Sequence, residues 1–174
     1  MMLETDRLIL RRWENRDLAP FATLNADPEV LRHIGAGNPL TRAESDAFVR
    51  RIEAGFEEHG FGLWCVEPRD EAVSCIGFTG LAIPAFLPEV LPAVEIGWRL
   101  ARSHWGRGLA TEAATAVVAY AFEDLRLERI VSIRDPDNRA SGRVMEKLGM
   151  VHERDTVVPD TGARCSVYVL TAPR

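Results

Sequence analysis

The chain contains a single lysine, Lys147, and no unbroken run of 18 apolar residues. The absence of such a run excludes a conventional membrane-spanning helix. Residues 1–6 are acidic and lack the basic and apolar regions of a signal peptide. We therefore expect a cytoplasmic protein.

Positive charge is in deficit, because the formal net charge is −5 at pH 7. Nucleic acids and anionic membranes bind proteins with a basic surface, so we expect neither as a partner. Acceptors that carry positive charge, such as amines or basic peptides, would be attracted instead.

Cysteine and histidine do not occur in the spacings that metal sites use, so no metal is expected. The cysteines are odd in number and lie far apart in strand-like apolar runs, which indicates buried thiols rather than a disulfide framework. The residues concerned are Cys65, Cys75, Cys165, His33, His59, His104 and His152.

The length of 174 residues and the hydrophobic share of 47% fit one globular domain, which we expect to span residues 1–174. The pattern predicts an α+β fold: a mixed, mostly antiparallel sheet of six to seven strands flanked by helices. A β-α-β crossover should join residues 94–100 to residues 128–134. The other strands are expected at residues 5–12, 61–67, 73–83, 150–155 and 164–171.

Three helix starts carry capping signals. Asn15 can cap a first helix, and Asp27 can cap a second helix with Pro28 at its first position. Thr41 and Glu44 have capping-box spacing and should begin a longer helix that ends by residue 60.

The loop of residues 84–92 is apolar and contains three prolines, which cannot join a sheet interior. It is either a connection folded on its own side chains, or a surface in which Phe86 and Leu87 form an acceptor lip or the contact of a homodimer.

The stretch from residue 94 to residue 113 reads as strand, glycine turn and helix. Alternation places Glu95, Gly97 and Arg99 on one face of the strand. Glycines in the turn let backbone N–H groups approach a ligand closely, and the first turn of the following helix carries the positive end of the helix dipole. This arrangement favours a phosphate-bearing ligand.

Two common phosphate-binding motifs do not fit this turn. A Walker-type loop needs a lysine directly after its second glycine, and Lys147 is far away. The dinucleotide fingerprint needs glycine where Thr111 stands. The remaining G-x-G pattern is weak evidence by itself.

The combination of this stretch with motifs elsewhere in the chain makes the signal specific, and four motifs carry it. They are Glu4-Thr5-Asp6-Arg7-Leu8-Ile9-Leu10-Arg11, Glu95-Ile96-Gly97-Trp98, Trp105-Gly106-Arg107-Gly108-Leu109-Ala110-Thr111-Glu112-Ala113, and Asn138-x-x-Ser141 running into Glu146-Lys147-Leu148-Gly149-Met150. In these motifs the chain resembles the GCN5-related N-acetyltransferase (GNAT) superfamily, and within it the branch of ribosomal-protein N-terminal acetyltransferases. One departure is Trp105, which stands where the broad family pattern has glutamine or arginine.

The resemblance implies that acetyl-CoA lies along residues 96–100, where this strand parts from the strand at residues 128–134. Backbone groups would contact the pantetheine arm, Asn138 would clamp it, and Ser141 would lie near the sulfur. The implied cofactor-binding residues are Trp98, Arg99, Leu100, Arg102, Gly106, Arg107, Gly108, Ala110, Thr111, Asn138 and Ser141.

Acetyl transfer to an amine needs a base and a proton source. Glu95 is the candidate base, with a purely structural glutamate as the alternative. Ser141 is the candidate acid, with a helix-capping or cofactor-contact hydroxyl as the alternative, and Tyr168 is its substitute. His104 and Asp135 are read as turn residues.

The acceptor is expected to be a primary amine, and a protein or peptide N-terminus is favoured. An α-amino group with a pKa of about 8 is roughly one-tenth neutral at pH 7, whereas lysine is almost fully charged. A small-molecule amine and a non-catalytic acyl-CoA-binding module are the alternatives. Acceptor choice would depend on the loops at residues 33–40, 84–92 and 156–163.

Overall fold

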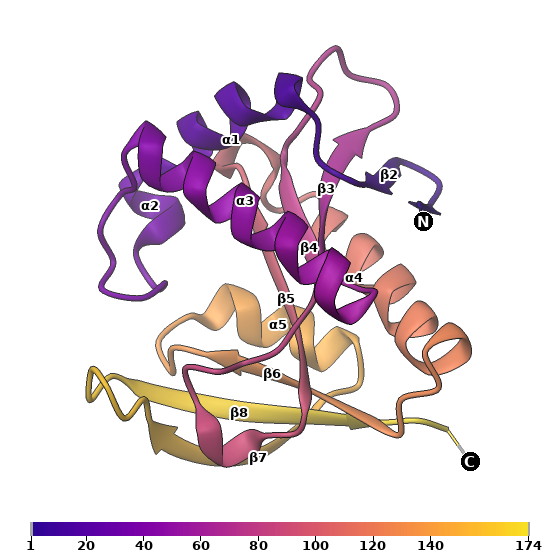
Figure 1. Ribbon diagram of the computed structural model, residues 1–174. Coiled ribbons are helices and arrows are strands. Elements are labelled where there is room, and N and C mark those ends of the chain that lie inside the picture. The colour runs from indigo at the N-terminus through magenta and orange to yellow at the C-terminus, as the bar shows by residue number, and fades with distance from the viewer. Residues whose placement is uncertain (1, 174) are drawn as a thin grey trace.

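A computed structural model describes residues 2–173 as a mixed sheet with helices on both faces (Figure 1). The sheet has eight strands in the order β1-β2-β3-β4-β5-β6-β8-β7, and every neighbouring pair is antiparallel except β5 and β6. The strands are β1 (Leu3–Glu4), β2 (Leu8–Arg11), β3 (Leu63–Pro68), β4 (Gly77–Ala82), β5 (Val94–Leu100), β6 (Arg129–Arg134), β7 (Val151–Val157) and β8 (Arg164–Thr171). The helices are η1 (Asn15–Asp17), α1 (Leu18–Asn25), α2 (Pro28–Leu31), α3 (Arg42–His59), η2 (Pro88–Val90), η3 (Arg102–His104), α4 (Leu109–Ala119), η4 (Tyr120–Asp124) and α5 (Arg139–Lys147).

The α+β class and the β-α-β crossover are confirmed, since α4 joins the parallel strands β5 and β6. The strand count exceeds the expected six to seven by the short strand β1. Its turn onto β2 is closed by Thr5, whose N–H donates to Leu8 O at 3.0 Å and whose Oγ1 accepts from Leu8 N at 3.0 Å. A strand of two residues is too short to produce a periodic pattern, so the sequence analysis, which placed the first strand at residues 5–12, did not predict it.

The helices divide between the two faces of the sheet. In Figure 1, α3 crosses in front of the central strands with α1 and α2 beside it, while α4 and α5 lie behind them. Side chains of β5 point alternately to these two faces, and the guanidinium of Arg99 lies against the ring of Phe48 on α3. Its neighbours Trp98 and Leu100 point the other way and belong to the main hydrophobic core.

Two of the three expected helix caps are present. Asp27 Oδ1 accepts from Glu29 N at 3.0 Å with Pro28 in the first helical turn of α2. Thr41 and Glu44 form the expected capping box at the start of α3, which ends at the left-handed Gly60.

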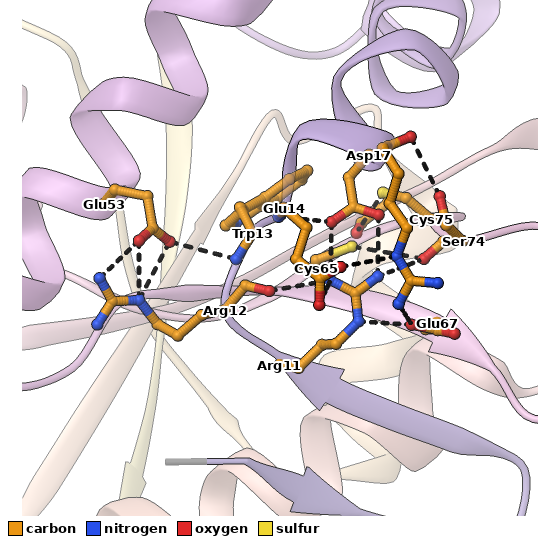
Figure 2. A network of polar contacts seen from close by, with 12 residues as sticks. Arg11, Arg12, Trp13, Glu14, Asp17, Glu53, Cys65, Glu67, Ser74 and Cys75 are labelled. Carbon is orange, nitrogen blue, oxygen red and sulfur yellow. Dashed lines mark hydrogen bonds and ion pairs between the residues drawn. The ribbon is translucent and has the colours of Figure 1, made fainter.

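The expected cap at Asn15 is wrong, because Glu14 occupies the N-cap and Asn15 lies inside the short helix η1. A buried ion pair sets this helix start (Figure 2). Arg11 donates to Asp17 in two parallel hydrogen bonds of 2.7 and 2.9 Å, and Asp17 Oδ2 also accepts from Glu14 N at 2.8 Å. Asp17 is fully buried. The ion pair thereby ties the entry of α1 to strand β2.

The Arg11–Asp17 pair holds both groups in their charged forms. Burial alone would raise the pKa of Asp17, but the hydrogen bonds from Arg11 and the Glu14 backbone outweigh it and keep that pKa below its usual value. The hydrogen bond to Asp17 is the main cause of the raised pKa of Arg11. Breaking such a pair leaves an uncompensated buried charge.

The loop of residues 84–92 folds against the sheet. Leu87 is fully buried in a second apolar cluster with Val90, Val131, Cys165 and Val167. The expectation that Leu87 forms an acceptor lip or a dimer contact is therefore wrong, because its side chain packs on β6 and β8. Phe86 is 45% exposed.

All three cysteines are free and buried, as expected. Within residues 2–173, no helix combines the length and the apolarity that a bilayer span requires.

We predict that Asp17→Asn lowers the free energy of unfolding at pH 7 by about 3 kcal/mol, because Arg11 loses its main counter-charge. The lowered pKa of Asp17 means that this stabilisation is present above the unfolded pKa of about 3.9 and is lost as the pH falls through the folded pKa. The difference in the free energy of unfolding between the unmodified protein and Asp17→Asn should therefore become smaller below about pH 4. Urea denaturation across this pH range measures it.

The matched control is Asp46→Asn, which removes the exposed helical pair of Arg42 and Asp46 on α3. We expect a change below about 0.5 kcal/mol for this variant. An equal effect of the two substitutions would contradict the structural role of the buried pair.

Candidate active site

Strands β5 and β6 pair over only two residues and then part. Their parallel ladder joins Val94 to Ile130 and Glu95 to Val131, although β5 continues to Leu100 and β6 to Arg134. On its other side, β5 pairs with β4 from Glu95 to Leu100, and β6 pairs with β8 along its whole length. The sheet therefore opens through its middle toward the carboxyl ends of the two strands.

Backbone groups of β5 line this opening. Ile96 O accepts from Ser132 Oγ of β6 at 2.9 Å, which shows that the even-numbered residues of β5 present their polar groups to this side. Trp98 follows two residues later and has no partner residue on β6. An extended ligand could pair with the backbone of Trp98 as a short additional strand would.

The turn at the end of β5 presents unpaired backbone N–H groups. Gly106 and Gly108 have left-handed φ angles of 74° and 78°, and Gly108 is the N-cap of α4. The N–H groups of residues 106 to 111 donate no hydrogen bond to any group in residues 2–173, and the first that does is Glu112 N, to Gly108 O at 3.0 Å. Free amides at the positive end of an 11-residue helix form an anion-binding site.

The amino-terminal motif of residues 4–11 stabilises this turn through hydrogen bonds. Glu112 accepts from Thr5 Oγ1 at 2.6 Å and from the Arg7 side chain at 2.7 Å. Arg7 also donates to Arg107 O at 3.0 Å. Two sequence motifs more than 100 residues apart therefore meet at the glycine turn.

The arginines expected at the phosphates are ion-paired in this structure. Arg102 lies 3.2 Å from Asp27, and Arg107 lies 2.9 Å from Glu71. Glu71 also pairs with His104, which is nearly buried in the turn and matches its interpretation as a turn residue.

Trp105 stands where the broad family pattern has glutamine or arginine. Its indole N–H donates to Leu100 O at 2.8 Å. The indole thereby fixes the glycine turn to the last residue of β5, on the side of the opening.

Glu95 lies where the two strands part. Burial raises the pKa of Glu95 to about 8, although a hydrogen bond from the Ile133 backbone lowers it in part. At pH 8 about half of the molecules would carry an ionised Glu95, which suits a group that takes up and releases a proton.

Ser141 lies in α5 and Tyr168 in β8. Asn138 Oδ1 accepts from Ser141 N at 3.1 Å, so Asn138 caps α5. The Ser141 hydroxyl makes no hydrogen bond to any group in the described part of the chain. Tyr168 is nearly buried, and its hydroxyl accepts from Arg134 Nη2 at 3.1 Å.

Sequence reasoning missed Arg134, which it treated only as the end of a strand. Its Nη1 donates to Pro136 O at 2.6 Å and to Asn138 O at 3.4 Å. A Cβ at Gly142 would lie 3.3 Å from its Nε. Arg134 thus connects Tyr168 to the turn that carries α5, and the position of Gly142 directly after Ser141 was the available signal.

Sequence reasoning also missed a bridge across the open ends of β5 and β6. His33 follows α2 and lies 2.8 Å from Asp135, the residue after β6. Asp27 at the start of α2 pairs with Arg102, just after β5. The α2 segment therefore spans the two parted strands, and Asp135 does more than shape its turn.

The two described cavities lie elsewhere. One of about 290 Å³ lies between η1 and α3 and includes Trp13 and Val49, and one of about 600 Å³ adjoins the opposite ends of β5 and β6 and includes Val94 and Arg129. We place the candidate site at the parted strands because the unpaired backbone and the titrating carboxyl group are there. In residues 2–173, no group of three or more metal-ligating side chains is present.

A family model for the acetyltransferase (GNAT) domain matches residues 7–151. The chain is 33% identical over 154 residues to the uncharacterized N-acetyltransferase YoaA of Bacillus subtilis, which covers 87% of this chain and 84% of that protein. A crystal structure of an acetyltransferase from Agrobacterium tumefaciens matches with a TM-score of 0.82 at 30% identity, over 99% of this chain and 95% of that chain.

A structure of RimL, the ribosomal L7/L12 alpha-N-protein acetyltransferase, in complex with coenzyme A has a TM-score of 0.79 at 14% identity over 98% of both chains, which is a likeness of fold alone. The family model covers most of the chain, and the two closer matches extend over nearly all of it. The chain therefore belongs to the GNAT family of acetyltransferases and is an N-acetyltransferase.

Proposed function

We propose that this protein moves an acetyl group from acetyl-CoA to the α-amine of a protein or peptide N-terminus, by direct attack in a ternary complex. The observation that carries the proposal is the set of unpaired N–H groups at residues 106 to 111, directly beyond the opening between β5 and β6. The family uses acetyl-CoA, and coenzyme A is bound in the RimL structure whose fold this chain shares.

The residues present fit a coenzyme A molecule. The free amides from Gly106 to Thr111 would hold its pyrophosphate, and the unpaired backbone of Trp98 would hold its pantetheine arm. Bound acetyl-CoA supplies an acetyl thioester. Arg102 and Arg107 would add positive charge if they exchanged their carboxylate partners for phosphate.

Glu95 suits the role of base for an α-amine. A Glu95 pKa of about 8 is close to the value of about 8 for an α-ammonium group, so the proton transfer would be nearly balanced. A lysine ammonium has a pKa of about 10.4, more than two units above that of Glu95, and would therefore lose its proton to Glu95 less readily. This match favours an N-terminal acceptor.

The departing sulfur needs a proton, and two hydroxyls could give it. Ser141 Oγ is available at the start of α5, whereas Tyr168 Oη already accepts from Arg134 and keeps its own proton free to donate. Ser141 is the first candidate because its hydroxyl has no competing partner in the part of the chain that the structure describes. A small-molecule amine acceptor and a non-catalytic acyl-CoA-binding module remain the alternatives.

We predict that Glu95→Gln lowers kcat by about 100-fold or more with peptide acceptors, because the proton acceptor is lost. In the unmodified enzyme, kcat at saturating acceptor should rise with pH and level off above about pH 8, as Glu95 becomes ionised. The variant should lose this rise. Thiol release from acetyl-CoA, followed from pH 6 to pH 9.5, measures both effects.

Asp46→Asn on the outer side of α3 is the control and should leave the pH profile unchanged. If Glu95→Gln retained both the rate and the pH profile, the catalytic role of Glu95 would be excluded. Coenzyme A binding without turnover of any peptide or small amine would favour the non-catalytic alternative.

We further predict that Ala110→Pro weakens coenzyme A binding by about 10-fold, since it removes one charge-assisted hydrogen-bond donor from the turn. The Ala110 N–H has no partner within residues 2–173, so the melting temperature should change little. Ala110→Ser keeps the N–H and is the control. Unchanged calorimetric affinity in a folded Ala110→Pro variant would contradict a pyrophosphate site at this turn.

A further inference from the structure

Arg99 is a cation without a carboxylate partner in the described part of the chain. It extends from β5 on the same face as Glu95 and Gly97, and its Nη1 donates to Asn25 Oδ1 at 2.7 Å. Its guanidinium lies 5.3 and 5.1 Å from the ring centroids of Phe48 and Phe78. No carboxylate oxygen of residues 2–173 lies within 4 Å of it, and its buried Nε has no hydrogen-bond partner.

The environment of Arg99, which is half-buried with a buried Nε, contrasts with that of the buried Arg11. Arg11 has Asp17 and Glu67 as counter-charges within 2.7 Å. Burial lowers the pKa of Arg99 to about 10, so that it remains charged at neutral pH without internal compensation. Buried charges in proteins are normally paired, which means that Arg99 lacks a counter-charge that a bound molecule could supply.

The guanidinium is held in place before any ligand arrives. Asn25 is fully buried on α1, and its Nδ2 donates to Ser45 Oγ of α3 at 2.9 Å. This bond turns Asn25 Oδ1 toward Arg99. The two helices thereby fix the direction of the cation, as a preorganised binding site requires.

The strand surface between Glu95 and Arg99 is open. A Cβ placed on Gly97 would meet no atom within 4 Å. On the neighbouring strand β4 the glycines are closely covered, since a Cβ on Gly80 would lie 2.1 Å from Gly62 O. The space over Gly97 can therefore receive a ligand group.

The spacing of the three residues suggests how an acceptor would lie. Residues two apart on a strand point to the same face, and the Cα atoms of Glu95 and Arg99 are roughly 13 Å apart at about 3.3 Å per residue. Both side chains are long and can shorten this span. An amine near Glu95 and an anionic group a few bonds away near Arg99 fit one acceptor.

We propose that the acceptor lies over Gly97 and that Arg99 recognises a carboxylate near its reactive amine. The acceptor class is a peptide N-terminus with an acidic side chain within its first three residues. This inference rests on the proposed function, because the amine is placed at Glu95. It also reverses, at the site itself, the preference for basic peptides that the net charge of −5 suggests.

The test compares peptides that differ only in an acid and its amide, Ser-Glu-Ala-Ala and Ser-Gln-Ala-Ala. The enzyme should show a kcat/KM about 10- to 100-fold higher for the acidic peptide, the range expected for charge-assisted hydrogen bonds. Arg99→Gln should remove this preference, so that the variant uses the acidic and the amide peptide with about equal kcat/KM. Arg51→Gln is the control, because Arg51 faces the same Phe48 ring from α3 and should keep the preference.

A binding measurement separates this inference from the proposed function. The N-acetylated forms of both peptides are titrated into the coenzyme A complex by calorimetry, which needs no turnover. Tighter binding of the acidic form, lost in Arg99→Gln, would support the role of Arg99 even if the enzyme acetylated neither peptide. Failure to acetylate either peptide would count against the proposed function instead. Equal binding of the two forms, or an equal loss for both in the variant, would overturn the inference.

Gly97→Val gives a second and independent measurement. The added side chain should fill the open space and raise KM for the acidic peptide by about tenfold or more, while the melting temperature and coenzyme A affinity change little. An unchanged KM in the folded variant would show that the acceptor does not lie over Gly97 and would overturn that part of the inference.

Discussion

The parting of β5 from β6 is the constraint on which the site depends. Two adjacent parallel strands would normally continue their ladder, but here it ends after Glu95 and Val131. The opening is tolerated because each strand is hydrogen-bonded on its other edge, to β4 and to β8. Side chains also replace part of the missing ladder, since Ser132 Oγ donates to Ile96 O. What remains unpaired, above all the backbone of Trp98, is available to a ligand.

Segments from distant parts of the chain hold this opening in shape. Arg7 and Glu112 fix the glycine turn against the amino-terminal strands. The α2 segment joins the ends of the parted strands, with His33 bound to Asp135 on one side. Arg134 connects the start of α5 to Tyr168. The N–H groups at the glycine turn can remain without protein partners because these other contacts stabilise the turn.

Arg11 and Arg99 show two different uses of charge in this structure. The Arg11–Asp17 pair satisfies itself and fixes the entry of the first helices, as Figure 2 shows. Arg99 is held by neutral and aromatic neighbours, Asn25 and Phe78 among them. Glu95 is the complementary case, a half-buried carboxyl group with a raised pKa and no cationic partner within residues 2–173. A guanidinium and a carboxyl group of raised pKa on one strand face, separated by an open glycine, are the observations behind the proposed acceptor with an amine and a carboxylate.

The sequence alone determined the features that depend on neighbouring residues. The alternation of apolar residues predicted β5, and the capping box of Thr41 predicted the start of α3. The glycines of the turn have the left-handed φ angles that the shape of the turn requires. The ordered motifs identified the family. Such signals are readable because they arise from backbone geometry and from contacts three or four residues apart.

Only the tertiary structure decided what depends on burial and on distant partners. The pairing of Asp17 with Arg11 moved a helix start away from Asn15, and packing on β6 and β8 buried Leu87. The raised pKa of Glu95 and the missing counter-charge of Arg99 follow from what surrounds each group in space. Desolvation and long-range pairing leave no periodic trace along a chain, which is why the family could be recognised from the sequence while the charge arrangement of the site could not.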